Sequence, residues 1–452
     1  MILVRSLPLF DERPTLWQQL VVGFWYINLG LVGVLWATTA DFGGLADWLD
    51  AAGMLVGLLA VYFALTQFML MGRIGWLERH FGLDRLAGYH RINGYLAISF
   101  ILVHPIFITF SYALSAHIGP IHQYADLITK YAWVWLALIG ELLFITVVAS
   151  SIYIARRRLK FETWYFVHLL VYLAIVCVSI HPFFVSDSFS GGEHPLAIAY
   201  WLGLYCFVAL NLLIWRFGLP VYNWLRFGWR IDEVLHENER TTSIYIRGRQ
   251  LRRWRSRPGQ FVMVRIFTRG LWWQEHPFSL SWIPHDDRLR LTIRNVGDYT
   301  AAIAKLRPGA RVLVSGPYGR FTREVARTDK RLFIAGGVGI TPLRSLAEEA
   351  LAAGQDCVLV YGNRLPDDVP LQAELAQLKL PTHHVYSDVK VRGSAHGYVD
   401  AGLIRRLVPD FKHRDVYLCG PPPMMTGIID GLLAAGLDPA QLHYERFALH
   451  AG

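Results

Sequence analysis

The chain has 452 residues, of which 54% are hydrophobic and 17% are charged, and its formal net charge is +9. The apolar excess is confined to the first half of the chain and excludes an ordinary soluble protein of this size. The positive charge does not require a nucleic-acid partner, because many basic residues stand at the ends of apolar runs or in short loops between them.

Six apolar runs are long enough to cross a bilayer as helices: 16–38, 51–71, 90–110, 131–155, 161–180 and 197–217. The loops between them alternate in charge. Residues 40–50 are acidic, 73–91 hold four arginines, 112–130 are nearly free of cations, 156–160 are densely basic, and 183–195 have no Lys or Arg. The positive-inside rule therefore predicts a multi-pass protein of the cell (inner) membrane with both termini in the cytoplasm.

The third and fifth runs each carry two histidines. Thirteen residues separate His90 from His104, so a helix places their imidazoles about 21 Å apart on nearly the same face. Twelve residues separate His168 from His181, which leaves this second pair off a common face, so the fifth helix needs local unwinding, a wide turn or a compensating haem rotation. Each run thus has one histidine near each membrane surface, an arrangement that suits the axial ligands of two b-type haems.

Other roles for polar residues inside these runs stay open. A single intramembrane histidine is equally well explained as a hydrogen-bonded packing residue or a proton carrier, but four at matched depth favour ligation. We expect His90 and His168 to hold an inner haem, and His104 and His181 an outer one. Glu141, near the middle of the fourth run, either bonds a neighbouring polar residue such as Asn211 or Gln67, which we favour, or compensates charge near the haems.

A change of pattern follows a short basic and aromatic linker, residues 218–230. Short alternating strands broken by Pro-Gly turns predict an antiparallel β-barrel, and from Arg331 a strand–helix–strand rhythm predicts a doubly wound α/β domain. The predicted organisation is a six-helix transmembrane domain (1–217), the linker, a barrel domain (231–327) and an α/β nucleotide domain (328–452).

Four glycine- or proline-containing motifs lie in this half of the chain. A glycine-rich segment, 336–342, follows a strand and opens a helix, where backbone N–H groups and the helix N-terminus favour a pyrophosphate. Alone it is a weak signal, because it is not the standard dinucleotide fingerprint. It gains specificity from its order along the chain with His276-Pro277-Phe278-Ser279, residues 316–319, and Cys419-Gly420-Pro421-Pro422.

Together, the histidine spacings and these motifs resemble the NADPH oxidase and ferric reductase superfamily, and the prokaryotic type of NADPH oxidase in particular. The resemblance implies a two-haem membrane domain fused to a ferredoxin-reductase-like dehydrogenase that binds FAD and NADPH or NADH. It implies that Phe278 stacks near the flavin beside His276 and Pro277, and that Ser279 bonds its reactive edge. Further residues carried over from the family are Arg294, Gly297 and Thr300 for the flavin phosphates, Gly337, Gly339, Thr341 and Pro342 for the nicotinamide dinucleotide, Cys419 and Gly420 beside the nicotinamide, and Phe447 over the flavin.

Cofactor preference is predicted from Arg364, which follows the strand at 357–361. The second strand of such domains ends near the adenosine ribose, where an arginine can pair with a 2′-phosphate. The alternative is a solvated loop arginine.

The resemblance implies electron transfer from a cytosolic nicotinamide through FAD and two haems to an acceptor across the membrane. We expect O₂, giving superoxide, with a ferric chelate as the second candidate and a partner redox protein as the third. No accessory protein is required by the sequence, and its four cysteines, without metal or disulfide spacing, fit a reduced compartment.

Overall fold

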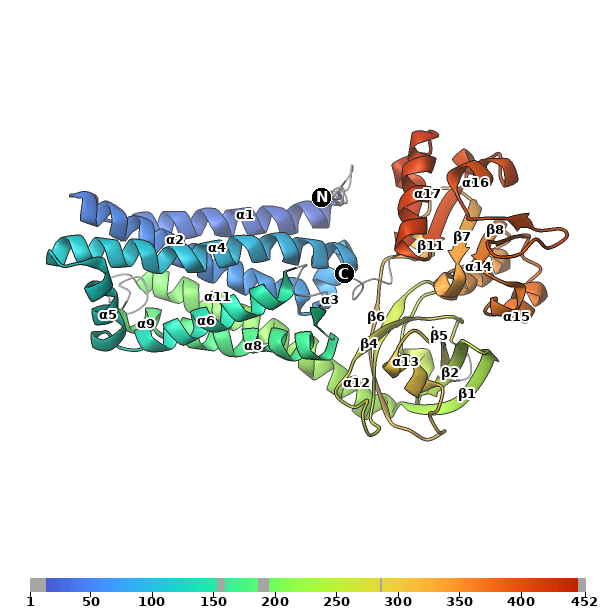
Figure 1. The fold of residues 1–452 in the computed structure, drawn as a ribbon, viewed down its shortest axis with the longest axis horizontal. Helices are drawn as coiled ribbons and strands as arrows, with labels where there is room; N and C mark the ends of the chain where they lie inside the picture. The colour runs from blue at the N-terminus through green and yellow to red at the C-terminus, as the bar shows by residue number, and fades with distance from the viewer. Residues whose placement is uncertain (1–13, 153–157, 160, 186–194, 285–286, 446–452) are drawn as a thin grey trace. The chain divides into compact units, whose positions relative to one another are not determined.

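The structure is a computed structural model that describes residues 14–152, 158–159, 161–185, 195–284 and 287–445. It divides into two compact units, one up to Arg216 and one from Phe217 onward. Each unit is described separately below (Figure 1).

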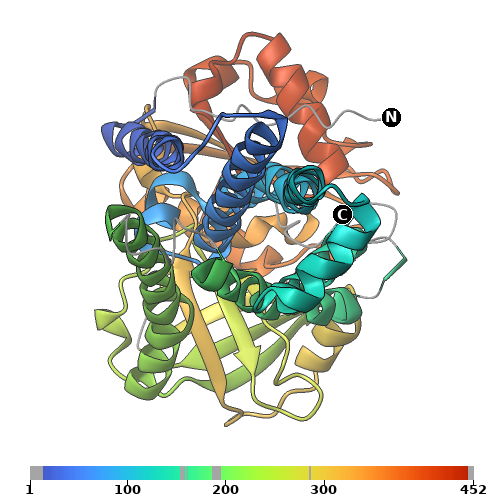
Figure 2. The same ribbon diagram turned by 90° about the vertical axis from the view of Figure 1, so that its left-hand side faces the viewer.

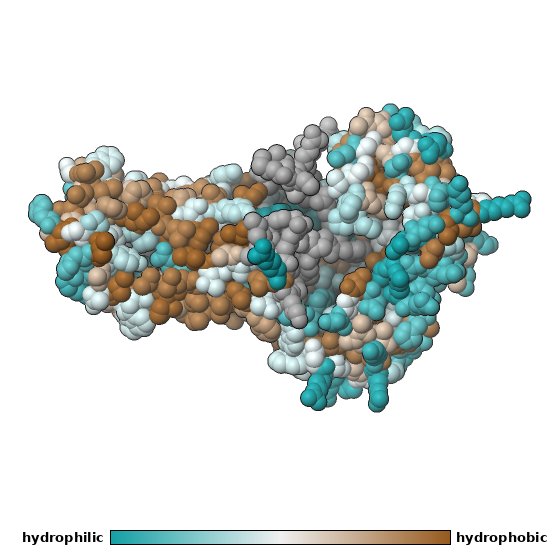
Figure 3. Space-filling model, viewed as in Figure 1, coloured by the Kyte–Doolittle hydropathy of each residue, from teal (hydrophilic) through white to brown (hydrophobic). Residues whose placement is uncertain are grey.

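The first unit holds six helices that are long and apolar enough to cross a membrane, as the sequence predicts. Apolar side chains cover much of the visible surface of this bundle (Figure 3), and Figure 2 views its helices nearly end-on. The six are α1 (Leu16–Ala37), α2 (Leu45–Met71), α4 (Leu83–Ala116), α6 (Val134–Ser151), α8 (Phe161–Ile180) and α11 (Pro195–Asn211), the last continuing through a π-helical turn (Leu212–Gly218).

Small residues let the central helices approach closely. α2 packs along α4, and α6 packs along α8. A Cβ atom on Gly53 of α2 would lie 2.7 Å from the Ile108 side chain of α4, and one on Gly140 of α6 would lie 2.9 Å from the Ala174 carbonyl of α8. Glycine at these contacts brings backbones together, which drives helix association in lipid.

Three shorter helices join the spans: α3 (Gly75–Phe81), α5 (Pro120–Lys130) and α9 (Pro182–Val185). The segment 112–130 is therefore not the open loop that the sequence suggested. α4 continues to Ala116, and α5 starts with a proline in its first turn and carries a Lys130–Asp126 ion pair of 2.6 Å one turn apart. In Figure 1, α5 lies across the end of the bundle where α1 finishes.

The second unit begins with α12 (Leu219–Phe227) and two three-stranded antiparallel sheets, ordered β1-β2-β5 and β4-β3-β6. Isolated bridges join Arg230 to Arg311 and Leu280 to Leu291 between the strands. A common core of fully buried side chains, including Trp229, Val264 and Leu291, lies between the sheets. The strands are β1 (Arg230–Asn238), β2 (Thr241–Arg247), β3 (Phe261–Ile266), β4 (His276–Ser279), β5 (Arg288–Arg294) and β6 (Val312–Tyr318), with α13 (Asp298–Ile303) before β6.

The rest of this unit is a six-stranded parallel sheet with the order β10-β9-β8-β7-β11-β12. Separate apolar clusters cover its two faces. The strand order reverses between β7 and β11, and in open α/β sheets ligands bind at the carboxyl ends of the strands beside such a reversal. The elements are β7 (Lys330–Gly336), α14 (Ile340–Ala352), β8 (Asp356–Asn363), α15 (Gln372–Gln377), β9 (Thr382–Tyr386), β10 (Ala395–His396), α16 (Ala401–Leu407), β11 (Asp415–Cys419), α17 (Pro422–Ala434) and β12 (Leu442–Glu445).

Candidate functional site

The four histidines of the membrane unit form two pairs. The ring centroids of His90 and His168 lie 6.2 Å apart, and those of His104 and His181 lie 6.4 Å apart. A metal bonded to one nitrogen of each ring at about 2 Å places the two ring centres about 6 Å apart. Both pairs therefore have the separation that a shared metal ion requires.

The His104 ring is held by two glycines of α2. Its Nδ1 atom lies 2.8 Å from the Gly53 carbonyl oxygen, so Nδ1 carries the proton and donates it. A Cβ atom on Gly57 would lie 2.7 Å from the same Nδ1, so only glycine leaves room for the ring. Because Nδ1 donates this hydrogen bond, the lone pair of Nε2 is left for a metal. Metal-binding histidines usually donate their other ring N–H in this way.

His168 is oriented by neighbours on both sides. Its Nδ1 lies 3.3 Å from the Ser151 hydroxyl, and Trp164 stacks on its ring with centroids 5.1 Å apart. The Trp164 indole in turn donates to the Ser151 hydroxyl at 3.2 Å. The ring is therefore fixed from its own helix and from the end of α6.

His181 lies where the chain breaks between two helices. α8 ends at Ile180, and α9 starts at Pro182 with the His181 carbonyl accepting from the amides of Phe184 and Val185 at 3.0 and 3.1 Å. α8 therefore ends directly before His181, and the His181 ring lies 6.4 Å from that of His104 between ring centroids.

Hydrogen-bonded packing does not explain every ring. Within the described residues, the buried Nδ1 atoms of His90 and His181 form no hydrogen bond of normal geometry, although the backbones of Gln67 and Val178 lie near these two rings. Leaving a buried polar atom unpaired costs about 1–3 kcal/mol. Each histidine pair thus contains one ring that packing alone would not hold in its position. The two rings of each pair therefore fit a ligand bound between them.

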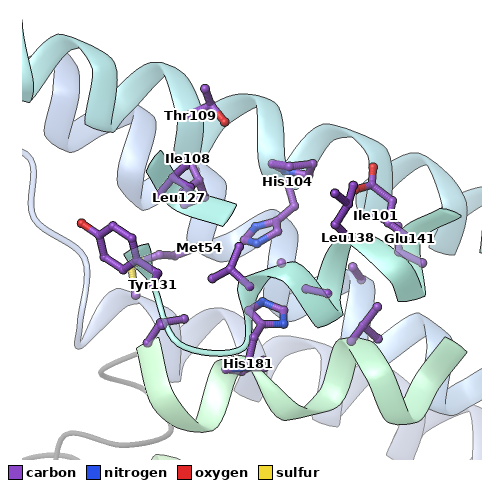
Figure 4. Close-up of a pocket in the computed structure, with 18 of the residues that line it drawn as sticks. Met54, Ile101, His104, Ile108, Thr109, Leu127, Tyr131, Leu138, Glu141 and His181 are labelled. Carbon is purple, nitrogen blue, oxygen red and sulfur yellow. The ribbon is translucent and has the colours of Figure 1, made fainter. Parts of the chain in front are cut away.

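A cavity of about 260 Å³ opens beside His104 and His181. Figure 4 shows the two rings directed toward each other in this cavity, with Glu141 and Leu138 of α6 on its wall. In the described part of the chain, no hydrogen bond joins Glu141 to Asn211 or Gln67. The Asn211 amide instead accepts from the Trp76 indole at 3.1 Å. The structural role favoured from the sequence therefore lacks its named partners.

The His-Pro-Phe-Ser motif forms β4 and pairs with β3. The Ser279 hydroxyl is buried and has no partner among the described residues, which suits a ligand that accepts a hydrogen bond there. The Tyr299 ring, which the sequence did not single out, lies 3.9 Å from that of His276 at a tilt of 35°, and 6.5 Å from that of Phe278 in a nearly parallel orientation, both measured between ring centroids. Tyr299 lies five residues after Arg294, in the segment that the sequence analysis assigned to the flavin phosphates. This position is the sequence signal from which Tyr299 could have been identified as a residue of the flavin site.

The remaining residues expected at the flavin phosphates lie at the end of β5 and the start of α13. The backbone amide of Gly297 donates to the Thr300 hydroxyl at 3.0 Å. The Arg294 guanidinium pairs with Asp368 of the α/β part at 2.5 Å, and it lies 3.1 Å from the position of a Cβ on Gly337. Arg294 thus connects the expected flavin-phosphate region with the glycine-rich loop, and Asp368 is a further residue that the sequence did not identify.

The glycine-rich loop closes on β11. Gly337 has φ of +52°, in the left-handed region that favours glycine. A Cβ on Gly339 would lie 2.2 Å from the Cys419 carbonyl oxygen, and one on Gly420 would lie 3.1 Å from the Gly336 amide. This close approach joins the two predicted nicotinamide-binding segments at the reversal of strand order, where a dinucleotide reaches the backbone.

Two more predicted residues flank this loop. The Thr341 hydroxyl donates to the Val338 carbonyl at 3.0 Å, and Pro342 is buried in the first turn of α14. Cys419 is fully buried, and burial, together with the Glu445 carboxylate, raises the pKa of its thiol well above the ordinary value. The thiol is therefore uncharged at neutral pH.

Arg364 extends from the end of β8 and is 67% exposed. Its Nε and Nη2 atoms pair with one oxygen of Asp388, at 3.0 and 2.9 Å. The Ser387 hydroxyl and the Arg364 guanidinium lower the pKa of Asp388, so the pair stays charged at neutral pH. Phe447 lies outside the described residues.

Buried polar links join the antiparallel and parallel parts of this unit. Arg290 of β5 is 2% exposed, pairs with Glu374 of α15, and donates to the Ser281 carbonyl at 2.8 Å. The Ser345 hydroxyl of α14 donates to the Leu280 carbonyl at 3.0 Å. These bonds fix the two halves of the expected cofactor site relative to each other.

Comparison with known families matches three consecutive parts of the chain. Residues 56–179 match a ferric reductase like transmembrane component, residues 233–322 an FAD-binding domain, and residues 333–430 an oxidoreductase NAD-binding domain.

Individual relatives match the second half. The ferredoxin reductase component of 3-ketosteroid-9-alpha-monooxygenase from Mycolicibacterium smegmatis is 32% identical over 200 residues, 43% of this chain and 56% of that protein. The sulfhydrogenase 2 subunit gamma of Pyrococcus furiosus is 31% identical over 207 residues, 41% of this chain and 70% of that protein. A ferredoxin NADP+ reductase from Neisseria gonorrhoeae with bound FAD and NADP has a TM-score of 0.44 and 18% identity, covering 49% of this chain and 99% of its own. The chain thus spans only about half the length of the first of these relatives. With its ferric-reductase-like membrane domain joined to FAD-binding and NAD-binding domains, the chain belongs to the superfamily of NADPH oxidases and ferric reductases.

Proposed function

We propose that this protein is an NADPH oxidase that carries electrons across the cell membrane from cytosolic NADPH, through FAD and two b-type haems, to O₂, with superoxide as the product. The observation that carries the proposal is the pairing of four histidines at two levels of the same helices, at 6.2 and 6.4 Å. When bound, FAD and the haems would supply the conversion of the electron pair of one hydride into two single-electron transfers. The protein binds, positions and insulates the cofactors.

The membrane helices supply the haem ligands. His90 and His168 would hold the inner haem, and His104 and His181 the outer haem. The Gly53 carbonyl and the Ser151 hydroxyl orient one ring of each pair, which raises ligand basicity and fixes the ring plane. The basic loops support, by the positive-inside rule, a cytoplasmic location for the His90 end, both termini and the dehydrogenase unit.

The second unit would hold the flavin and the nicotinamide. We infer that the two antiparallel sheets form one flavin-binding barrel, since bridges join them and they share a core. Ser279 would donate its unpaired hydroxyl to the flavin edge, Phe278 would stack near the ring, and Arg294 with the Gly297–Thr300 turn would bind the phosphates. Phe447 would complete the flavin site.

The carboxyl edge of the parallel sheet would hold the dinucleotide. The backbone amides of Gly337, Gly339 and Thr341 would bind the pyrophosphate at the start of α14, and Pro342, which has no N–H, would hold the first turn of that helix in place. Cys419 and Gly420 would lie beside the nicotinamide. Arg364 extends where a 2′-phosphate is expected, which favours NADPH over NADH.

The electron balance defines the product. Each NADPH gives up a hydride, so NADPH and two O₂ yield NADP⁺, two superoxide ions and one proton. His104 and His181 would together hold the outer haem, which would supply single electrons to the acceptor. A ferric-chelate reductase is the second candidate. An electron-supplying role toward a partner protein is the third, because one of the relatives named above is the ferredoxin reductase component of a monooxygenase.

The test is the purified protein loaded with haem and FAD and supplied with NADPH. We expect cytochrome c reduction that superoxide dismutase abolishes, at two superoxide ions per NADPH. Ferric-citrate reduction that is faster than this and insensitive to the dismutase would identify a ferric reductase. Failure of NADPH to reduce the haems would reject the whole electron path.

A further inference from the structure

Three segments of the second unit lie together around α12, which packs against β6 (Figure 1). The backbone amide of Arg249 donates to the Phe227 carbonyl at the end of α12, at 2.7 Å. The Trp224 ring of α12 lies 5.6 Å from that of Phe267 between centroids. Loops on both sides of β3 therefore adjoin this helix. We call the exposed side of these segments the α12 face; they are residues 219–230, 247–257 and 267–272.

The α12 face is basic. Its three segments contain nine arginines and no Asp or Glu, and six of these arginines are in residues 247–257. The first and the last of the six pair with acids at 3.2 and 3.1 Å. Between them are three exposed arginines that form no ion pair among the described residues: Arg249, Arg253 and Arg255. The face therefore carries positive charge that the described part of the chain does not neutralise.

Apolar and aromatic side chains are exposed beside these charges. Val221, Tyr222 and Leu225 follow one another at one-turn spacing on α12, and Leu225 is 68% exposed. Trp272, on the third segment, is 60% exposed. Arg226 donates to the Tyr222 hydroxyl at 2.5 Å, and its guanidinium carbon lies 5.7 Å from the centre of the Tyr222 ring. Arginines mixed with exposed aromatic and aliphatic side chains are typical of helices that lie in the headgroup layer of a membrane.

The chain itself brings α12 to a membrane surface. Only seven residues, Leu212–Gly218, separate it from α11. From Pro195 to Gly218 a helix rises about 36 Å, which exceeds the ~30 Å of the hydrocarbon layer, so the last span has crossed that layer where α12 begins. Topology does not account for the arginines of 247–257, because the positive-inside rule counts residues within about 15–20 positions of a span, and this segment starts beyond that distance from Gly218.

We propose that the α12 face docks on the anionic phospholipid headgroups of the membrane that the helices cross. Arg249, Arg253 and Arg255 would bind lipid phosphates, and the exposed apolar side chains of α12 would enter the headgroup layer. A nucleic acid or an acidic protein would also attract arginines. The short connection to α11 favours the lipid, because it holds α12 within reach of a bilayer at all times. The proposal concerns the attachment of the second unit and does not depend on which acceptor receives the electrons.

The test uses the full-length protein in nanodiscs of phosphatidylcholine, with and without added phosphatidylglycerol, in the absence of NADPH. Phenylglyoxal modifies accessible guanidinium groups, and peptide mass spectrometry gives the modification rate at each arginine. Each arginine near an anionic surface raises the docked-to-undocked ratio roughly fivefold. We therefore expect phosphatidylglycerol to slow the modification of Arg249, Arg253 and Arg255 by roughly fivefold or more, and high salt to reverse this.

Three exposed arginines of the α/β part are the controls: Arg392, Arg405 and Arg406. Their rates should be equal in the two lipids. Equal rates on the α12 face in both lipids, or an equal slowing at the controls, overturns the proposal. Glycerol phosphate or RNA added to the phosphatidylcholine nanodiscs tests the other sources of phosphate. Protection of the face by either of them, as strong as that by phosphatidylglycerol, overturns the assignment to lipid.

A triple variant, Arg249→Gln with Arg253→Gln and Arg255→Gln, removes the three charges, and docking is then measured at the unchanged Arg226. The docked-to-undocked ratio should fall roughly a hundredfold, so phosphatidylglycerol should no longer protect Arg226. Protection should persist in the matched triple variant of the three control arginines. Unaltered protection of Arg226 in the first variant overturns the proposal, and the lipid and salt dependence of the unmodified protein decides the matter even if that variant does not fold. Reduction of the haems by NADPH, measured separately, tests the proposed function alone.

Discussion

Replacing Gly57 by alanine should empty the haem site at His104 and His181. The added Cβ would lie 2.7 Å from His104 Nδ1 and 2.8 Å from its Cε1, whereas ordinary contact begins at 3.4 Å. The His104 ring must therefore move about 0.7 Å away from the added Cβ. This shift equals one quarter of the 2.8 Å that separates Nδ1 from the Gly53 carbonyl oxygen in their hydrogen bond. Losing that bond costs about 1 kcal/mol, and losing an orienting second bond typically lowers metal affinity by roughly 10–100-fold.

The measurement is haem content of the purified protein, with reduced-minus-oxidised spectra. We expect the reduced b-type absorbance of Gly57→Ala to fall toward half, with the remaining haem at His90 and His168. Gly30→Ala is the matched control, because a Cβ on Gly30 of α1 would meet nothing within 4 Å. Full occupancy of both haems in Gly57→Ala, with unchanged spectra, would refute the reasoning.

Three further predictions concern single residues. His181→Ala should remove one axial ligand and roughly half of the reduced b-type absorbance, and normal haem content in single variants of all four histidines would reject the ligand assignment. Arg364→Ala should raise the KM for NADPH by roughly tenfold or more and leave the KM for NADH nearly unchanged; steady-state kinetics with both donors check this, and equal effects contradict it. Burial raises the pKa of Asp415, but bonds from His443, Thr328 and the backbone outweigh burial and hold it below the ordinary value. The stability that this carboxylate supplies is therefore present above the unfolded-state pKa of about 3.9 and is lost as the pH falls further. Asp415→Asn should destabilise the unit by about 3 kcal/mol at pH 7 and flatten the acid limb of its unfolding curve, as thermal melts at pH 3 to 7 would show; an acid limb as steep as that of the unmodified protein would count against this account.

Composition and spacing determined the architecture of the membrane unit. Six apolar runs must become helices, because only intrahelical bonds satisfy the backbone in lipid, and the structure confirms six such helices. The order of the motifs along the chain determined the family. Glycines between a strand and a helix mainly serve to let the backbone approach a ligand closely, so their position indicates a nucleotide-binding segment. Element boundaries were less certain. The sequence analysis did not predict the helices α3, α5, α9, α12, α13 and α16 or the strands β1, β10 and β12. Most of these are segments of seven residues or fewer, which carry little periodicity, but β1 has nine residues.

The sequence also raised a difficulty that only the structure resolved. Thirteen steps of an ideal helix would turn His181 away from the face of His168. α8 ends at Ile180, directly before His181, and the His181 ring lies 6.4 Å from that of His104 between ring centroids. Spacing gave the depth of each histidine, whereas the direction of each ring depended on where the helix ended.

Contacts between distant segments were decided only by the tertiary structure. Asp368 reaches Arg294 across 74 positions, and Glu374 reaches Arg290 across 84. Neither acid has a local pattern that identifies its partner. Glu141 is similar, since the sequence located it in a span but did not show that it lines the cavity beside His104 and His181. Periodicity follows the backbone of one element, but a site is made where several elements pack, and that packing depends on the shapes of side chains far apart in the chain.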